Sequence, residues 1–198
     1  VLDDLFRQES QGLVENIARQ RRRYGTFSAT VMGGAALGSE AYAVRHSSTT
    51  LLYNTSSGKL DAVLEPGTLA WIRTGAASGV AAKYMSAPEA SVVGVLGAGR
   101  QAVTQIQAIC AVRPVQQIKI YSRTAETRES FAREMAEQLG VSVEPVESAQ
   151  AAVGGSQIVV AITNAREPVF DGNDLEPGTH VIAAGSNSWM KREIDSTT

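Results

Sequence analysis

A glycine-rich turn carries the clearest chemical signal in the sequence. Its six residues are Gly97, Ala98, Gly99, Arg100, Gln101 and Ala102. They follow a continuously apolar segment at 91–96, typical of a buried strand, and open a predicted helix that runs to residue 112. In such a turn the first glycine makes the bend, the second lets a diphosphate approach, and a small third residue lets helix and strand pack. Because N–H groups at a helix start attract anions, the segment predicts the diphosphate site of a dinucleotide.

The end of the next predicted strand indicates which nicotinamide dinucleotide would fit. There Tyr121 is followed by Ser122, Arg123 and Thr124, and the first carboxylate is Glu126. A carboxylate at this point would bind the ribose 2′-hydroxyl and repel a 2′-phosphate, whereas hydroxyls and a guanidinium hold an anion. We therefore expect residues 122–124 to bind the cofactor and NADP(H) to be favoured over NAD(H). The alternative is that Arg123 is an ordinary surface arginine.

Strands alternate with helices throughout the part of the chain that holds these two motifs. Strands are predicted at 91–96, 118–121, 141–146, 157–162 and 180–184, and helices at 100–112, 125–139 and 148–153. This alternation indicates right-handed crossovers and an α/β fold with a Rossmann-type, doubly wound parallel sheet. In that fold a ligand lies at the carboxyl ends of the strands, where both motifs occur.

The chain before residue 88 has a different texture, which indicates part of a separate α+β domain. Residues 1–23 are polar and arginine-rich with apolar residues at a helical spacing, and strands are predicted at 41–44, 50–53 and 60–64. A helix is predicted at 69–85 with Gly75 and Gly79 in its interior. Because each glycine costs roughly 1 kcal/mol of helix propensity, backbone or ligand must pack closely on that face. We place the domain boundary near residue 88.

Composition argues against several other classes of function. The 18 Lys+Arg and 20 Asp+Glu give a net charge of −2, which disfavours nucleic-acid binding despite four arginines within 19–23. No apolar run approaches the roughly 20 residues that span a bilayer, and no signal-peptide pattern is visible. One cysteine, Cys110, cannot form an internal disulfide, and His46 and His180 are too isolated to indicate a metal site. We expect a cytoplasmic protein that binds small molecules and neither metal, membrane nor nucleic acid.

The sequence of the predicted helix and the glycine-rich turn together resembles that of the ornithine cyclodeaminase/mu-crystallin family. The resemblance rests on RTGAASGVAA at 73–82 and GVLGAGRQA at 94–102, and it continues through 120–124, 161–163, 184–187 and 191–193. It implies a homodimeric, NAD(P)-dependent enzyme whose Rossmann domain is inserted into a substrate-binding and dimerisation domain. Residues 1–88 would then be part of the substrate-binding domain and 89–198 the NAD(P)-binding domain. The segment that returns to the first domain in the family is expected to be absent here.

The resemblance also implies roles for individual residues. Arg73 and Arg19 match the arginines that bind a substrate carboxylate, which suits their bidentate guanidinium groups. The positions that match cofactor contacts are Thr74, Thr163, Ala184 and Gly185, together with the turn itself.

Two further positions depart from the family pattern. Glu40 stands where the family has its active-site lysine, and no lysine precedes Lys59. Arg45 is a poor substitute, because residues an odd number of positions apart in a strand point to opposite faces. Asn187 stands where ornithine cyclodeaminase has the aspartate that transfers a proton, and an amide cannot titrate. Glu40 and Asn187 are therefore candidate catalytic positions with altered chemistry.

These departures favour simple hydride transfer over cyclodeamination, because positioning and the cofactor supply most of the chemistry of hydride transfer. We expect an NAD(P)H-dependent oxidoreductase acting on the C=N or C–N bond of a small imino or amino acid, such as a ketimine reductase or amino-acid dehydrogenase. Two alternatives stay open at this point. One is a nucleotide-binding homologue whose turnover is impaired by the loss of the lysine, and the other is an ornithine cyclodeaminase.

Overall fold

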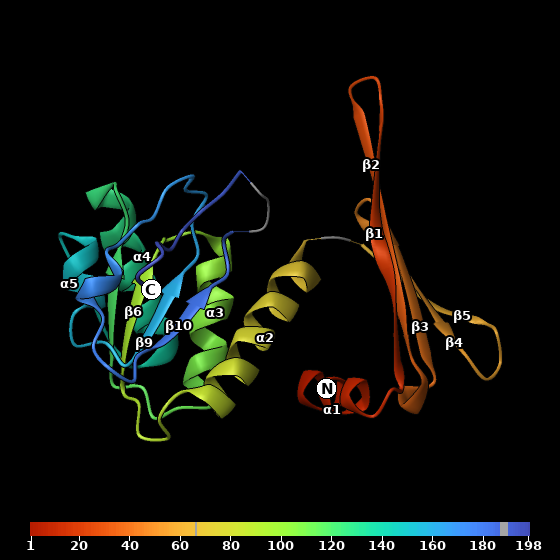
Figure 1. Ribbon diagram of the computed structural model, residues 1–198, viewed down its shortest axis with the longest axis horizontal. Coiled ribbons are helices and arrows are strands. Elements are labelled where there is room, and N and C mark those ends of the chain that lie inside the picture. The colour runs from red at the N-terminus through yellow and green to blue at the C-terminus, as the bar shows by residue number, and fades with distance from the viewer. Residues whose placement is uncertain (66, 187–189) are drawn as a thin grey trace. The chain divides into compact units, whose positions relative to one another are not determined.

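The computed structural model describes residues 1–65, 67–186 and 190–198, and the chain folds as two compact units. The first unit is Val1–Ala70 and the second is Trp71–Thr198 (Figure 1). Within the described ranges, no helix combines the length and the apolar character that crossing a bilayer requires.

The first unit is an antiparallel sheet with one short helix. In chain order its elements are α1 (Leu2–Ser10), β1 (Val14–Tyr24), β2 (Phe27–Ala36), the 3-10 turn η1 (Leu37–Ser39), β3 (Ala41–His46), β4 (Thr49–Asn54) and β5 (Leu60–Leu64). Each strand pairs with the next, in the order β1-β2-β3-β4-β5. The strands predicted at 41–44, 50–53 and 60–64 are thereby confirmed. Asn54 organises the last turn, because its side-chain oxygen accepts the N–H groups of Ser56 and Ser57.

The helical spacing across residues 1–23 is misleading beyond the first turns. The helix ends at Ser10, and Gly12 adopts a left-handed backbone with φ of 73° that leads the chain into β1. Val14 and Ile17 then pair with Ala36 and Gly33 of β2. β-branched residues favour a strand, and cross-strand pairing outweighs a short helical pattern. The arginines at 19–23 consequently lie exposed along a strand.

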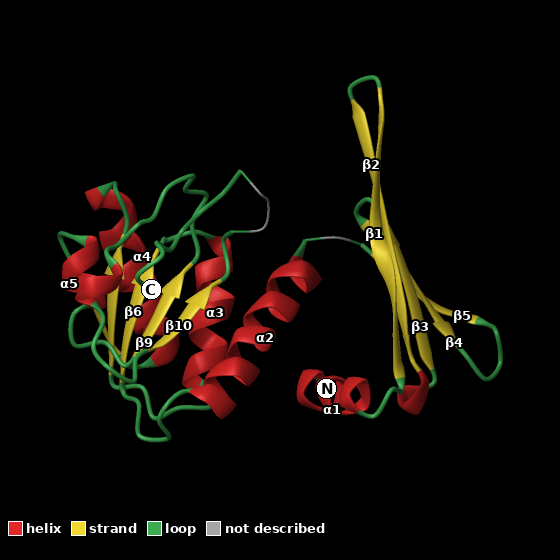
Figure 2. Cartoon of the chain, viewed as in Figure 1, coloured by secondary structure: helices red, strands yellow, loops and turns green. Residues whose placement is uncertain are grey.

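The second unit holds a five-stranded parallel sheet in the order β10-β9-β6-β7-β8. Its strands are β6 (Val92–Leu96), β7 (Gln117–Tyr121), β8 (Ser142–Pro145), β9 (Ile158–Ala161) and β10 (His180–Ala183). Helix α2 (Thr68–Met85) precedes the sheet, and the helices between the strands are α3 (Arg100–Cys110), α4 (Ala125–Leu139), α5 (Ala149–Val153) and the 3-10 turn η2 (Gly172–Asp174). The chain starts in the middle strand, moves to one edge and returns to build the other (Figure 2). This confirms the predicted α/β class and the doubly wound Rossmann-type sheet.

Two apolar layers cover the two faces of this sheet. One contains Ile106 and Ile109 of α3 and Phe131 and Met135 of α4, and the other contains Ala152 and Val153 of α5. The strand residues between the layers, such as Ile118 and Val159, are fully buried. The continuous apolar runs in the sequence reflect this burial on both faces.

Helix α2 packs on α3 through its glycines. A side chain on Gly75 would overlap the backbone of Thr104, and one on Gly79 would lie 2.9 Å from the Cβ of Ala108. The close approach expected from these glycines is therefore made by protein backbone. Arg113 also ties down the end of α2, because its guanidinium donates to the carbonyl of Lys83 at 2.7 Å and that of Ser86 at 2.9 Å. The division between the units consequently falls one helix earlier than the predicted boundary near residue 88.

Candidate functional site

The glycine-rich turn connects β6 to α3 and has the backbone that a diphosphate site needs. Gly97 has φ of 114°, and a side chain there would lie 2.5 Å from the carbonyl oxygen of Ile162. Only glycine fits that bend. A side chain on Gly99 would meet nothing within 4 Å, so the backbone beside the start of α3 is open to a ligand. Ala102 is fully buried and lets α3 pack on the sheet, as the sequence predicted.

Two cavities adjoin this turn at the carboxyl ends of the strands. The larger has a volume of about 540 Å³ and is lined by residues that follow β6, β7 and β9, including Gly97, Ala98, Gly99, Ser122, Arg123, Thr163 and Arg166. The smaller, of about 300 Å³, is lined by Trp71, Gly99, Arg100, Gln101, Ile162, Thr163, Asn164, Ala184 and Gly185. The two share Gly99 and the segment 162–164, so they form one cleft. Its place between β6 and β9 is the switch point of the sheet, where such folds bind dinucleotides.

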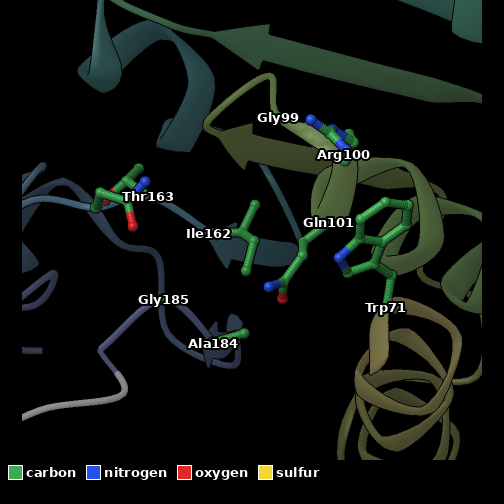
Figure 3. A pocket seen from close by; sticks show the side chains of 9 residues that line it. Trp71, Gly99, Arg100, Gln101, Ile162, Thr163, Ala184 and Gly185 are labelled. Carbon is green, nitrogen blue, oxygen red and sulfur yellow. The ribbon is translucent and has the colours of Figure 1, made fainter. Parts of the chain in front are cut away.

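The cleft is electrostatically suited to an anion. Three arginines line it, namely Arg100, Arg123 and Arg166, and the described lining residues include no carboxylate and no histidine. The guanidinium of Arg100 lies 5.2 Å from the ring centre of Trp71, within cation–π range. Figure 3 shows Trp71 and Arg100 on one side of the smaller cavity and Thr163 on the other, with Gln101 and Ile162 between them. The arrangement can hold phosphates and a flat ring, and the described lining residues supply no carboxylate or imidazole for proton transfer.

Neighbouring residues hold the loop after β7 in place. Arg128 of α4 is buried, donates to the carbonyl of Ser122 at 3.4 Å and forms an ion pair with Glu147. Thr124 is the N-terminal cap residue of α4, and its carbonyl accepts from the hydroxyl of Ser122 at 3.1 Å. Ser122 and Arg123 therefore line the cleft, while Thr124 shapes the loop and does not line either cavity.

Among the described residues, the other predicted site residues line neither cavity. Arg73 and Thr74 lie on α2, two and three positions after Trp71, and line neither cavity. Arg19 and Glu40 belong to the first unit. Glu40 is exposed, with a left-handed φ of 50°, immediately before β3. Asn187 lies outside the described residues.

Glu193 is a residue of the cleft wall to which the sequence assigned no role. It is 0% exposed, and its carboxylate accepts from the Thr163 N–H at 2.5 Å, the Thr163 hydroxyl at 2.6 Å and the Gly185 N–H at 2.6 Å. Trp71, Asn164 and Arg166 were likewise not predicted as cofactor contacts. Glu193, Asn164 and Arg166 lie in loops, where single polar residues carry no periodic pattern, so only their meeting in the fold reveals them.

Comparison with known proteins agrees with this geometry. The model of the ornithine cyclodeaminase/mu-crystallin family matches residues 31–198. Delta(1)-pyrroline-2-carboxylate reductase of Bacillus cereus is 36% identical over 146 residues, which are 74% of this chain and 45% of that protein. Ketimine reductase mu-crystallin of Rattus norvegicus is 31% identical over 150 residues, 76% of this chain and 47% of that protein. The chain thus spans slightly less than half the length of these relatives.

A solved structure shows the same fold. Thermococcus litoralis Delta(1)-pyrroline-2-carboxylate reductase, in complex with NADH and L-proline, superposes with a TM-score of 0.89 at 31% identity, covering 100% of this chain and 66% of that one. The resemblance noted in the sequence is therefore confirmed over most of the chain. This protein belongs to the ornithine cyclodeaminase/mu-crystallin family.

Proposed function

We propose that this chain carries the cofactor site of an NAD(P)H-dependent reductase that acts on the C=N bond of a small imino acid. The observation that carries the proposal is the cleft at the switch point, with an open Gly99 and three lining arginines. The names of the relatives support the reaction class, since they include a ketimine reductase and pyrroline-2-carboxylate reductases.

The chemistry divides between the cofactor and the protein. When bound, a reduced nicotinamide supplies the hydride for a C=N bond. We assign Gly97, Ala98 and Gly99 to the diphosphate, with Arg100 beside it. Thr163, Ala184 and Gly185 form the wall beside the far half of the cofactor, because the dinucleotide crosses the switch point from β7 toward β9 and β10.

Substrate binding is assigned to two arginines. Arg73 and Arg19 would hold the substrate carboxylate, since a guanidinium fork matches a carboxylate in two parallel hydrogen bonds. Thr74 would lie beside the cofactor. An amide at Asn187 cannot release a proton. The nitrogen would therefore take its proton from water, or the hydride would be transferred to an imine that is already protonated.

We further propose that NADP(H) is preferred to NAD(H). Arg123 follows β7, where a ribose 2′-group would lie, and both Arg123 and Arg166 line the larger cavity, whose described lining residues include no carboxylate. Two guanidinium groups favour a 2′-phosphate. The Thermococcus litoralis relative was solved with NADH, and titrating this chain with both cofactors tests the preference directly.

A homodimer formed through the first unit is also proposed. Of the described residues in that unit only Ala29 is buried, while Ile17, Leu60 and Val63 are 45%, 49% and 57% exposed. A sheet normally buries one face against another layer, and a second copy would supply it. One cysteine in the whole chain suits a reducing compartment, and we propose the cytoplasm.

The test is a fluorescence titration of the chain with NADPH and NADH, followed by assays of cofactor oxidation with cyclic imino acids. We expect saturable binding of both, at least tenfold tighter for NADPH, and oxidation with at least one imino acid. Absence of binding would contradict the proposal, and equal affinities would contradict the cofactor preference alone.

A second candidate is a nucleotide-binding homologue with impaired turnover, and Glu40 is the observation that favours it. The Glu40→Lys variant would restore a cation where the family has its lysine. A large gain in turnover would support the impaired homologue. Unchanged turnover on imino acids that the unmodified chain already reduces would support the active reductase. The matched control is Glu15→Lys, which changes charge equally on an exposed position of β1.

A further inference from the structure

We propose that Glu193 is a positioning residue whose buried carboxylate fixes one wall of the cofactor cleft and favours the oxidised, cationic form of the nicotinamide. The inference rests on the proposed function, because it assumes that a nicotinamide lies beside this wall. Glu193 hydrogen-bonds to two residues that line the smaller cavity, Thr163 and Gly185.

Glu193 ties together the ends of two neighbouring strands. Its Oε1 accepts from the N–H and the hydroxyl of Thr163, just after β9, and its Oε2 accepts from the N–H of Gly185, just after β10. Thr163 and Gly185 both line the smaller cavity. A shift of this carboxylate would therefore move two parts of the same wall.

The surroundings allow little room for a different arrangement. A side chain on Gly185 would lie 2.5 Å from both carboxylate oxygens of Glu193, so the carboxylate packs directly against that backbone. The Thr163 hydroxyl in turn accepts from the N–H of Ala165 at 3.1 Å, and the backbone N–H of Glu193 donates to the hydroxyl of Ser186 at 3.0 Å. The wall is thus preorganised through one side chain.

The charge of this group bears on the cofactor. Among the described residues, the donors to the carboxylate are two backbone N–H groups and a hydroxyl, none of which carries a positive charge. A buried negative charge that is not cancelled by a cationic donor acts over a longer range than an exposed one. The nicotinamide ring is neutral when reduced and cationic when oxidised. Glu193 should therefore stabilise the oxidised form, which makes the bound reduced cofactor a stronger hydride donor.

The experiment measures the Kd of NADPH by fluorescence and that of NADP⁺ by competition, on the full chain. For Glu193→Gln we expect the ratio of the NADP⁺ Kd to the NADPH Kd to rise about tenfold, because the charge is lost while the shape is nearly kept. Glu129→Gln is the matched control, since it removes the same charge from an exposed position of α4 and should leave the ratio unchanged.

A second variant separates position from charge and serves if Glu193→Gln does not fold. Glu193→Asp keeps the charge on a shorter side chain, so we expect weaker binding of both cofactor forms with the ratio within about twofold of the starting protein. An unchanged ratio in Glu193→Gln, or unchanged affinities in Glu193→Asp, would overturn the inference. Failure of the unmodified chain to bind either form would instead contradict the proposed function.

Discussion

The two units differ most in how they bury apolar surface. The second unit has a layer of fully buried side chains on each face of its sheet, whereas Ala29 is the only buried residue described in the first. Burial of apolar surface is the main source of folding free energy. The second unit therefore contains the interactions that stabilise it, whereas the apolar side chains described in the first unit, apart from Ala29, are half-buried or exposed.

This difference explains why the proposed cofactor site lies in the second unit. A dinucleotide cleft needs strand ends held at fixed positions, and the buried sheet of the second unit provides them. Gly97 packs against the carbonyl of Ile162, whereas the space around Gly99 is open. The first unit contains two predicted site residues, the substrate-binding candidate Arg19 and the catalytic candidate Glu40, and both are exposed.

The largest expected effect compares the same substitution in the two units. Ile118→Ala removes a side chain that is 0% exposed in β7, and we expect it to lower the free energy of unfolding by about 2–5 kcal/mol. Ile17→Ala, at a position 45% exposed in β1, should cost about 1 kcal/mol or less. Chemical denaturation followed by circular dichroism measures both.

Equal losses for the two isoleucines would contradict a difference in burial between the two units. A loss for Ile17→Ala that grows with protein concentration would indicate that a second copy covers the first unit.

The fold of the second unit was largely predictable, for a physical reason. Its central strands β6 and β9 are buried on both faces and its helices on one, so hydrophobic pattern, glycine turns and tertiary packing all point to the same elements. Helix α4 was predicted with the bounds it has, Ala125–Leu139. In the first unit the pattern at residues 1–23 misled, because strand pairing between β1 and β2 is a long-range interaction that local spacing does not report.

Substitutions at two glycines of the glycine-rich turn should separate folding from cofactor binding. Gly99 has an extended backbone with φ of −99° and open space around it, so Gly99→Val should fold normally and block the approach of the diphosphate. We expect NADPH affinity to fall at least tenfold, about 1.4 kcal/mol, with little change in Tm. Gly97→Ala should lower both, since its φ of 114° and the Ile162 carbonyl exclude a side chain. Normal NADPH binding by Gly99→Val would show that the diphosphate lies elsewhere.

Arginines from the two units provide a third comparison. Arg123→Ala removes a charge from the larger cavity, and we expect NADPH to bind about tenfold more weakly while NADH changes little. Arg22→Ala removes the same charge from an exposed position of β1 and should leave both affinities unchanged. A parallel loss of NADH and NADPH affinity in Arg123→Ala would contradict a contact with the 2′-phosphate.

The smallest expected effect concerns acid stability in the second unit. The N–H groups of Gly172 and Thr198 donate to Asp195 and lower the pKa of this carboxyl to about 2. Because the unfolded chain binds the proton near pH 4, this stabilisation is present above about pH 4 and is lost as pH falls toward 2. Tm measured from pH 5 to 2 should fall less steeply in Asp195→Asn than in the unmodified chain. Identical slopes would show that the hydrogen bonds do not contribute.

The site was predictable only in part. The turn at 97–102 and Arg123 follow recognised local patterns, and the structure brings them together at one cleft. Glu193 and Arg166 could not be found this way, because their importance comes from contacts between distant loops. Arg19, Arg73 and Glu40 remain predictions from the resemblance.

A crystal structure of the protein with NADPH would test the proposed cofactor site most directly. We predict density for the diphosphate against the backbone of residues 97–102, with the adenosine half beside Arg123 and the nicotinamide beside Thr163 and Gly185. A diphosphate bound elsewhere on the molecule, or a turn covered by side chains in the bound state, would contradict this site.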